Sequence, residues 1–448
     1  MSYPPQLAVF LERLSGYSSN IFKLEPQGSN SAKANNIIRV TLPANAICDL
    51  RSFKLAFHAK IESAGGTGRL PNKIDSLVER VEVSFGGVQV SSGNNFYNVL
   101  RHAKDALMGD KTCPALGHPN VLRESESHQI EMFDTALQAN APYCISSWEG
   151  FLGSVEPHML DLSLLPECVV SIYLADNSVC VDAAGQELPG TATGAFTADA
   201  ATPNPVYALS QIYATIEVIG MADGLYDSMI SAAMSQGGGL ELPYKQYVSF
   251  QDTTNTMRFS VATQSLDRVW IVMRESNFNS PGGAVNKVGT KMAGAFVAEN
   301  DAGSSFYDVG VPHFEQPHYN GEQYLSKYFN FPRDAAGNRY QLQMNGALYP
   351  QFQASYEDWV EISKNSVLGK PVSHELRTLK EHYSVFCARF NLKDCEFQRL
   401  IAGTDTRGIA LNSFFNVYGD AGGRAFTVFC EMTSSLRIGR GLQLEVVQ

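Results

Sequence analysis

The sequence lacks the features that would direct it out of a cell or across a membrane. It has no Asn-x-Ser/Thr sequon, no Cys-x-x-Cys pair and no apolar run near the roughly 18 residues that span a bilayer. Its first 16 residues have no basic stretch and no signal cleavage site. The eight cysteines are scattered, which is typical of small buried side chains rather than of a disulfide framework. We therefore expect synthesis in a reducing cytoplasm.

Charge is also scarce, at 18% of residues against the usual quarter. The 34 basic and 45 acidic residues give a net charge of −11, which is the wrong sign for a protein that neutralises phosphates. No block of basic residues reverses this balance. We expect no direct binding to nucleic acid, and a surface partly shared with partner proteins.

The familiar catalytic motifs are absent. The sequence has no Gly-x-Ser-x-Gly elbow, no P-loop, no Gly-x-Gly-x-x-Gly after a strand and no His-Glu-x-x-His. The glycine motifs need a strand–turn–helix unit to hold a phosphate, and the pattern of this chain is not α/β. We predict no enzyme activity, no cofactor, and no catalytic or metal residues.

Several groups of residues could nevertheless carry chemistry. Some of the histidines and acids could bind a metal ion. In residues 374–382, however, two helical turns separate the two histidines, which is too far for both to bind one zinc ion. Adjacent acids point to different faces of a strand or helix, so neither acid pair forms a two-carboxylate site alone. The candidates are His374, Glu375, Glu381 and His382; His313 and His318 near Glu315; Asp394 with Glu396; Glu357 with Asp358; and Cys387 and Cys395 near His382.

Four aromatic side chains could serve as stacking platforms for sugars or bases. They are Trp148, Phe151, Trp270 and Trp359. Large aromatic residues more often fill cores and interfaces, and we favour that interpretation.

Length and composition predict two β-rich domains. A chain of 448 residues exceeds one ordinary domain, and 25 Phe and 19 Tyr suit sandwiches filled by bulky side chains. Alternating apolar residues indicate strands over 36–63 and 78–90, and Gly86-Gly87 marks a two-residue hairpin turn. A helix follows from about residue 95, and further strands cover 169–175 and 206–220.

The same order recurs downstream. Strands are predicted over 241–276, a hairpin turns at Asn345-Gly346, and a helix follows over 355–367. An offset of 259 residues aligns Gly87 with Gly346 and Tyr97 with Tyr356. Each half therefore uses one unit of strand, glycine turn, strand and helix.

Three more helices and one long loop are expected. The helices cover residues 1–16, 221–236 and 371–392; the last has a stripe of Leu376, Leu379, Tyr383, Phe386 and Phe390. The residues from 276 to 339 form an insertion rich in Gly, Ala and Asn, which we expect to project from the sandwich. Three strands separated by glycine turns complete the chain.

These elements predict an all-β protein of two tandem eight-stranded jelly-roll β-sandwiches with short inserted helices, a double jelly roll. The predicted divisions are an N-terminal arm over 1–30, a first jelly roll over 31–238 and a second over 239–448, which includes the insertion.

Four stretches resemble the major capsid proteins of polinton-like viruses and virophages. They are CDLRSFKLAFHAKIES (48–63), LPNKIDSLVERVEVSFGGVQVSSGNNFYNVL (70–100), SSWEGFLG (146–153) and SLDRVWIVMRES (265–276). That group is similar to the wider double jelly-roll lineage of adenovirus hexons and large algal virus capsids.

The resemblance implies a structural subunit of a DNA virus: a homotrimer that forms a pseudo-hexagonal capsomer in an icosahedral shell of the virion. It also implies contacts with neighbouring capsomers, penton proteins and minor or cement proteins, and with an internal membrane where one exists. The insertion would form a low tower on the outer surface.

Two rival functions are a two-domain sandwich protein that binds or degrades carbohydrate and a jelly-roll enzyme of the cupin type. The first would carry secretion signals, sequons and a clustered acid pair, and the first two are missing. The second needs histidines clustered on successive strands, whereas few of the nine here share a strand region.

Overall fold

The structure is a computed structural model of the 448-residue chain. It describes residues 17–62, 68–71, 74–91, 95–108, 123–124, 141–182, 206–221, 240–276, 278–279, 327–329, 331, 337–367, 385–391, 403–408, 413–419, 424–439 and 443–447.

The first half of the chain forms two facing sheets. The larger, called here the first large sheet, has the strand order β1-β13-β4-β9-β8, with β10 on β4 and β2 on β13. The smaller has the order β3-β11-β6-β7. Their bounds are β1 Tyr17–Leu24, β2 Ala32–Lys33, β3 Ile37–Thr41, β4 Ile47–Ile61, β6 Val78–Phe85, β7 Val88–Ser91, β8 Arg123–Glu124, β9 Ala141–Ile145, β10 Met159–Asp161, β11 Cys168–Leu174 and β13 Tyr207–Met221. A separate pair joins β5 Gly68–Arg69 to β12 Val181–Asp182.

The second half repeats this plan. Its larger sheet, the second large sheet, has the order β14-β21-β16-β19, with β22 on β21, and its smaller sheet has the order β15-β20-β17-β18. The bounds are β14 Leu240–Asp252, β15 Thr256–Phe259, β16 Leu266–Glu275, β17 Arg339–Met344, β18 Ala347–Ala354, β19 Val385–Arg389, β20 Ser413–Tyr418, β21 Arg424–Ile438 and β22 Leu444–Val447.

The two halves have one topology. When the eight main strands of each half are counted in chain order, the large sheet reads 1-8-3-6 and the small sheet reads 2-7-4-5 in both. Every pairing among these strands is antiparallel, for example β14 with β21 over 13 residue pairs. Two four-stranded sheets with these crossing connections make a jelly roll, so the predicted double jelly roll is confirmed.

A helix follows the fifth strand of each half. These helices are α2, Tyr97–Met108, and α8, Tyr356–Ser366. Their first residues are the two tyrosines that the 259-residue offset aligned, so the sequence echo is a structural repeat. Ser355 caps α8 in a capping box with Asp358, which fixes where the helix begins.

The two hairpin turns have the backbone that their sequences predict. Gly86 and Gly87 have φ of 55° and 86°, and Asn345 and Gly346 have φ of 47° and 80°. Positive φ at both central residues matches the right-handed twist of the flanking strands. The four residues therefore connect β6 to β7 and β17 to β18 without splaying the strands.

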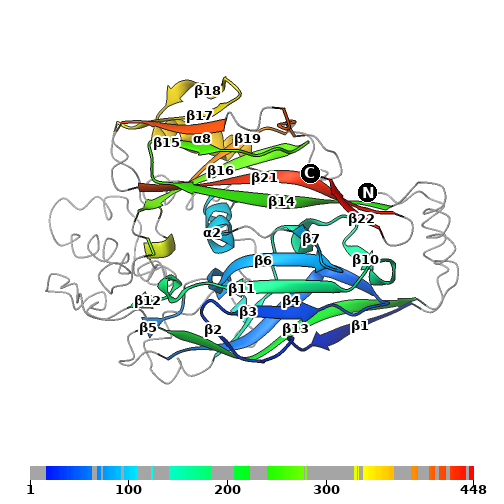
Figure 1. Ribbon diagram of the computed structural model, residues 1–448. Coiled ribbons are helices and arrows are strands. Elements are labelled where there is room, and N and C mark those ends of the chain that lie inside the picture. The colour runs from blue at the N-terminus through cyan, green and yellow to red at the C-terminus, as the bar shows by residue number, and fades with distance from the viewer. Residues whose placement is uncertain are drawn as a thin grey trace.

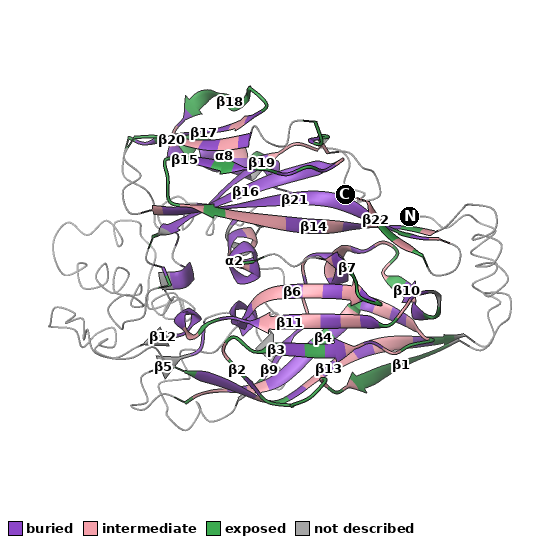
Figure 2. Ribbon diagram, viewed as in Figure 1, coloured by how far each residue is buried: buried purple, intermediate pink, exposed green. Residues whose placement is uncertain are grey.

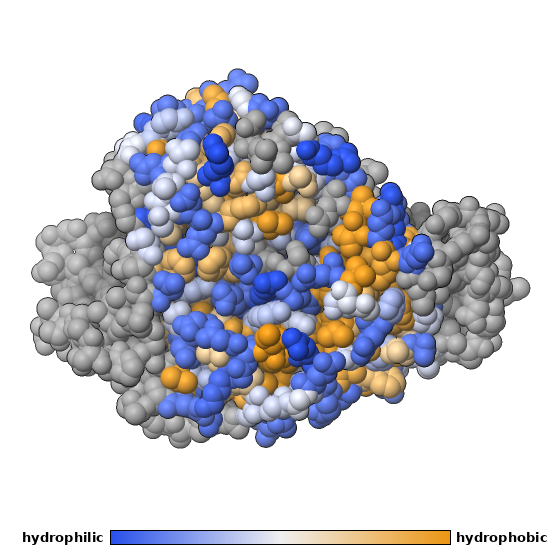
Figure 3. Space-filling model, viewed as in Figure 1, coloured by the Kyte–Doolittle hydropathy of each residue, from blue (hydrophilic) through white to orange (hydrophobic). Residues whose placement is uncertain are grey.

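The layers stack in one direction (Figure 1). The first large sheet lies at the bottom of the view, followed by its small sheet, α2, the second large sheet and the last small sheet at the top. Buried residues continue through the middle of this stack (Figure 2), and one hydrophobic cluster includes residues of both halves. On the face shown in Figure 3, hydrophobic residues appear as separate areas among hydrophilic ones.

One predicted helix is wrong in its last part. The sequence favoured a helix over 371–392, but Val385–Arg389 is strand β19, paired with β16. Four of its five residues are buried, so the strand has none of the polar alternation that marks a half-exposed strand. Because both faces of this strand are apolar, its sequence pattern resembles the apolar stripe of an amphipathic helix.

The predicted N-terminal arm of residues 1–30 also needs correction. Tyr17–Leu24 is strand β1 and pairs with β13 along its whole length. It is the first strand of the first sandwich, at the edge of the large sheet, where one ladder of backbone hydrogen bonds stabilises a polar segment.

Other predictions fall partly or wholly outside the described residues. These are the helices over 1–16 and 221–236, residues 371–384 of the third helix and most of the 276–339 insertion. The described ends of the insertion do not project, because Phe278, Tyr328, Phe329 and Phe331 are buried.

Gly86→Ala should destabilise the protein more than Gly87→Ala. Both changes force alanine into positive φ, which costs about 1 kcal/mol or more. A Cβ at Gly86 would also lie 2.7 Å from the Pro166 Cβ, whereas nothing lies within 4 Å of one at Gly87. Urea unfolding should give the lower midpoint for Gly86→Ala; equal midpoints would contradict the packing of this turn.

Candidate functional site: the junction between the two halves

The four aromatic residues considered as stacking platforms are all core residues. Trp148, Phe151, Trp270 and Trp359 are buried. The indole nitrogens of Trp148 and Trp359 donate to the backbone oxygens of Phe53 and Tyr340, at 2.8 and 3.1 Å. Buried rings with satisfied nitrogens offer no face to a sugar or a base, so the core interpretation is confirmed.

The acid pair on α8 is a helix start and not a two-carboxylate site. Asp358 accepts hydrogen bonds from the backbone nitrogen and hydroxyl of Ser355 at 2.9 and 2.8 Å. The backbone hydrogen bond, followed by the hydroxyl, holds the pKa of Asp358 below its usual value. Glu357 is exposed beside it.

Most of the other candidates lie outside the described residues. These are His313, His318, Glu315, His374, Glu375, Glu381, His382, Asp394, Cys395 and Glu396. Cys387 is described and is buried in β19, where burial raises the pKa of its thiol. Within the part of the chain that the structure describes, no three His, Cys, Asp or Glu residues gather as a metal site, and no helix is long and apolar enough to cross a bilayer.

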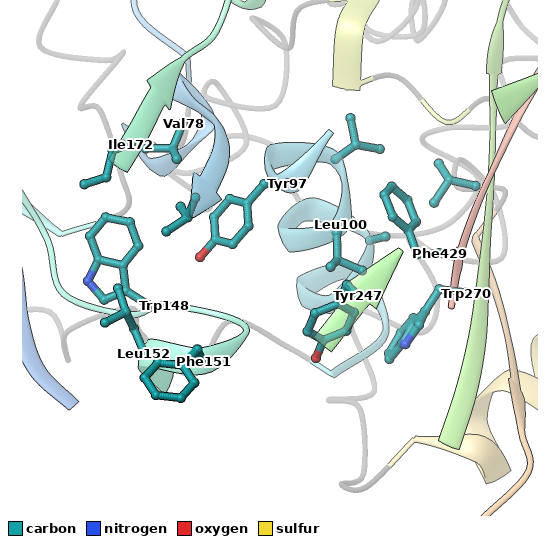
Figure 4. Packing of buried hydrophobic residues seen from close by; sticks show 14 of the residues in the cluster. Val78, Tyr97, Leu100, Trp148, Phe151, Leu152, Ile172, Tyr247, Trp270 and Phe429 are labelled. Atoms are coloured by element: carbon teal, nitrogen blue, oxygen red, sulfur yellow. The ribbon is translucent and has the colours of Figure 1, made fainter. Parts of the chain in front are cut away.

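Buried polar chemistry is instead concentrated where the first half meets the second. The junction consists of α2, β7 and α3 (Phe151–Ser154) from the first half and of β14, β16, β19 and β21 from the second. Its centre is apolar: Leu100 of α2 points toward Tyr247, Trp270 and Phe429 (Figure 4), and all four side chains are buried.

Hydrogen bonds to backbone groups fix strand β14 against the first half. The Tyr244 hydroxyl donates to the backbone oxygen of Val90 at 2.7 Å, and the backbone nitrogen of Lys245 donates to the Ser154 hydroxyl at 2.7 Å. The backbone nitrogen of Glu156 donates to Pro243 at 3.0 Å. The free edge of β14 is thereby occupied by a segment of the first sandwich.

Glu149 is the centre of an ionic group under α2. It accepts hydrogen bonds from Lys104 at 2.5 Å, Arg101 at 3.1 Å and the Tyr247 hydroxyl at 3.2 Å. Lys104 also donates to the Tyr247 oxygen at 3.1 Å, across the junction. Arg101 continues to Asp75 at 3.3 Å. One tyrosine of the second half thus completes a charge network of the first.

A second group lies on the second large sheet. Glu431 accepts from Arg268 at 3.1 Å and from the Trp270 indole at 2.9 Å. Asp267 accepts from Lys245 at 2.5 Å and from the Thr433 hydroxyl at 2.6 Å. Because buried charges are costly unless paired and hydrogen-bonded, these contacts within the second half stabilise its two acids where the first half covers them.

The carboxylates stay ionised in spite of burial. Desolvation raises the pKa of Glu431, but Arg268, Lys104 and Lys245 outweigh it and bring the pKa to about 2. Desolvation also raises the pKa of Glu149. Lys104 and Arg101 outweigh that effect, so the pKa of Glu149 is lowered. Lys104 therefore stabilises acids on both sides of the junction.

An aromatic cage around Arg274 adds a third contact. The guanidinium carbon lies 3.6 Å from the ring centre of Phe278, 4.8 Å from Phe96 and 5.2 Å from Tyr328. Burial lowers the pKa of Arg274 to about 10, and the Tyr328 contact partly offsets that effect. Cation–π contacts of this kind gain strength when water is excluded. The ends of the 276–339 insertion thus bind the first half to β16.

The junction is not apparent in the sequence. Its polar residues lie on alternating strands, and alternation predicts a face in water. The available signal was the mixture of bulky and charged residues on one face of β16, where Arg268, Trp270 and Arg274 follow at intervals of two or four. Such a face is typical of an interface rather than of exposed surface.

No protein-family profile and no curated protein matches this sequence. Solved structures do resemble it. PBCV-1 VP54, as fitted into a reconstruction of the virophage Sputnik, matches with a TM-score of 0.57 at 12% identity, over 97% of this chain and 98% of that chain. The PBCV-1 virus capsid gives 0.53 at 11% identity, over 97% and 98%.

The Faustovirus major capsid protein gives a TM-score of 0.51 at 8% identity, over 94% of this chain and 90% of that one. Three solved structures therefore follow the chain through both sandwiches. At these identities the likeness establishes the fold, the tandem double jelly roll.

Lys104→Met should cost about 3 kcal/mol of unfolding free energy, because it leaves the buried Glu149 without its closest cation. Lys60→Met is the matched control, since its ion pair with Glu62 is exposed and should change stability by less than about 1 kcal/mol. Urea unfolding followed by tryptophan fluorescence measures both. Equal, small effects would show that the network contributes little.

The stability of the protein should decrease as the pH is lowered, because acids at the junction become protonated. The folded-state pKa of Glu431 is about 2, below its ordinary value of 4.5, so its stabilisation is complete above about pH 5 and is lost as pH falls toward 2. Glu431→Gln should lower the unfolding free energy at pH 7 and flatten its slope between pH 5 and 3. An unchanged slope in urea titrations would rule out this linkage.

Proposed function

We propose that this chain is a structural subunit of a virus shell, a major capsid protein. The supporting observation is that two sandwiches of one topology are joined head-to-tail through a paired, buried junction. Two of the three solved structures matched above are named as a virus capsid and a major capsid protein, and they match over 97% and 94% of this chain.

Three copies would build one capsomer. Two like sandwiches per chain supply six similar units per trimer, so a trimer can meet six neighbours through nearly repeated contacts. This arrangement requires a fixed angle between the halves, which the hydrogen bonds that cross the junction from Tyr247, Tyr244 and Lys245 would provide. Neighbouring capsomers, penton proteins and minor or cement proteins are the expected partners.

We propose two domains that divide between Met221 and Leu240, preceded by an arm over residues 1–16. The remainder of the 276–339 insertion would form a tower on the outer surface. The arm would contact cement proteins, a neighbouring subunit or an internal membrane where one exists.

The location proposed is the virion, after synthesis in the host cytoplasm. The net charge of −11 favours a subunit that leaves the genome to other proteins. The described junction carboxylates Glu149, Asp267 and Glu431 all accept hydrogen bonds from protein donors, which suits a structural and not a catalytic role.

Light scattering coupled to size exclusion tests this function. The purified chain should elute as a trimer of three times 49.0 kDa, or as larger shells, at every salt concentration that leaves it folded. A monomer throughout, or a chain that cleaves glycans, would refute the structural role.

A further inference from the structure

The two hairpin turns share a backbone conformation but differ in chemistry. Both connect the fourth main strand of their half to the fifth, and both have positive φ at their two central residues. The first turn is Gly86-Gly87, which has no side chain that could react, and the second is Asn345-Gly346. The repeat therefore contains the same turn twice, once without and once with a side-chain amide.

An asparagine followed by glycine can lose its amide nitrogen without an enzyme. The backbone nitrogen of the next residue attacks the side-chain carbonyl carbon, and glycine hinders that attack least because it has no Cβ. Asn345 and Gly346 are both exposed. Within the described part of the chain, no hydrogen bond engages the Asn345 amide. The reacting group is thus accessible to water and free to move.

Two other exposed asparagines have positive φ, and neither meets the same conditions. The Asn35 side chain donates a hydrogen bond to the Asp176 carboxylate at 3.2 Å, and its next residue is Asn36. Asn45 is followed by Ala46, whose Cβ obstructs the attack. These two asparagines are internal controls for the backbone conformation and for exposure.

The second hairpin can open at its tip more easily than the first. In a turn with positive φ at both central residues, the asparagine amide points away from the next backbone nitrogen, so the tip has to open before the two can react. Strand β18 is an edge strand, and seven of its eight residues are not buried. The first hairpin is held by the hydrogen bond from Tyr244 to Val90 of β7.

Little of the second sandwich covers the strand next to the turn. The Tyr349 ring of β18 contacts the Phe390 ring, with the centres 4.9 Å apart, and two residue pairs of the ladder lie between this contact and the turn. A two-stranded ribbon without further cover is only marginally stable. Local opening of such a tip costs much less free energy than unfolding of the protein.

We propose that Asn345 is a modification site, at which the chain loses ammonia spontaneously and forms aspartate or isoaspartate. The backbone nitrogen of Gly346 forms a bond to the Asn345 Cγ, the bond from Cγ to Nδ2 breaks, and Nδ2 leaves as ammonia with the proton of the Gly346 nitrogen. Water then opens the cyclic imide at either of its carbonyl groups. Water is the co-reactant, and no group is oxidised or reduced.

The two products affect the hairpin differently. Aspartate adds a negative charge but keeps the length of the turn, and it tolerates positive φ as asparagine does. Isoaspartate directs the main chain through the former side chain, which adds a carbon atom to the turn. The register of a hairpin depends on the length of its turn. Isoaspartate therefore weakens the pairing of β18, which exposes Leu348, Tyr349 and Phe352 at the sheet edge.

Peptide mapping of the full-length protein tests this site. After incubation at mildly alkaline pH, mass spectrometry should find aspartate and isoaspartate at position 345, while Asn35 and Asn45 keep their amides. The second Asn-Gly pair of the sequence, at 320–321, lies outside the described residues and is separated in the map. A synthetic peptide of residues 341–349 is the unfolded reference and should convert faster than the protein.

The site is refuted if Asn345 keeps its amide during an incubation several times longer than the peptide needs. Conversion of Asn35 and Asn45 at the same rate as Asn345 would refute the selectivity of the turn. Asn345→Gly is the matched variant, because it gives the second hairpin the Gly-Gly turn of the first. It should remain folded by circular dichroism and show no conversion at position 345.

A second variant separates the added charge from the added backbone atom. Asn345→Asp carries the charge alone, so amide hydrogen exchange over β18 should match that of the unmodified protein. Protein enriched in isoaspartate should exchange faster over β18 and at the unmodified rate over β7. Equal exchange of β18 in all three forms would contradict the weakening of the hairpin.

Discussion

The second large sheet is buried on both faces, and the relation between the two halves depends on that burial. One face packs on its own small sheet, and the other packs on α2 of the first half. Strand β21 has twelve consecutive buried residues, among them Thr427, Glu431 and Thr433. A buried polar group without a partner costs about 1 to 3 kcal/mol, so each of these side chains has to find a donor or an acceptor.

The hydrogen-bond partners of these three side chains lie on the second large sheet itself, and the first half adds a cation near Glu431. Glu431 is paired on its own sheet by Arg268 and is stabilised at longer range by Lys104 of α2. Tyr247 of β14 completes the hydrogen bonds of Glu149. With apolar contacts alone, one half could slide over the other. The hydrogen bonds of Tyr247 form at only one relative position of the two halves. The capsid role that we propose would need such a fixed angle, because small errors would accumulate around a closed ring.

Local chemistry made much of the fold predictable. The turns at Gly86-Gly87 and Asn345-Gly346 require positive φ, and the helix starts at Tyr97 and Tyr356 follow from turn, cap and periodicity. The glycine turns and helix starts recur at an offset of 259 residues, and this recurrence indicated the repeat. Strand β19 was mistaken for helix because both of its faces are apolar, and β1 was missed because its pairing with β13 lies nearly 200 residues away.

The junction could not be predicted in the same way. Its residues come from distant segments, and the polar side of β21 looks like a solvent face until the neighbouring sandwich is in place. Lys104, Glu149 and Tyr247 become hydrogen-bond partners only when three segments come together: helix α2, the loop after β9, and strand β14. The interpretation of the aromatic residues as core was correct. Trp148 and Trp359 are buried, and large aromatic side chains contribute most when their apolar area is removed from water.

An electron cryomicroscopy reconstruction of the purified oligomer tests the central claim most directly. We expect a ring of six sandwiches from three chains, in which the angle between neighbouring sandwiches is nearly the same within a chain and between chains. A two-fold dimer, or a ring whose contacts between chains bear no relation to the junction within the chain, would contradict it.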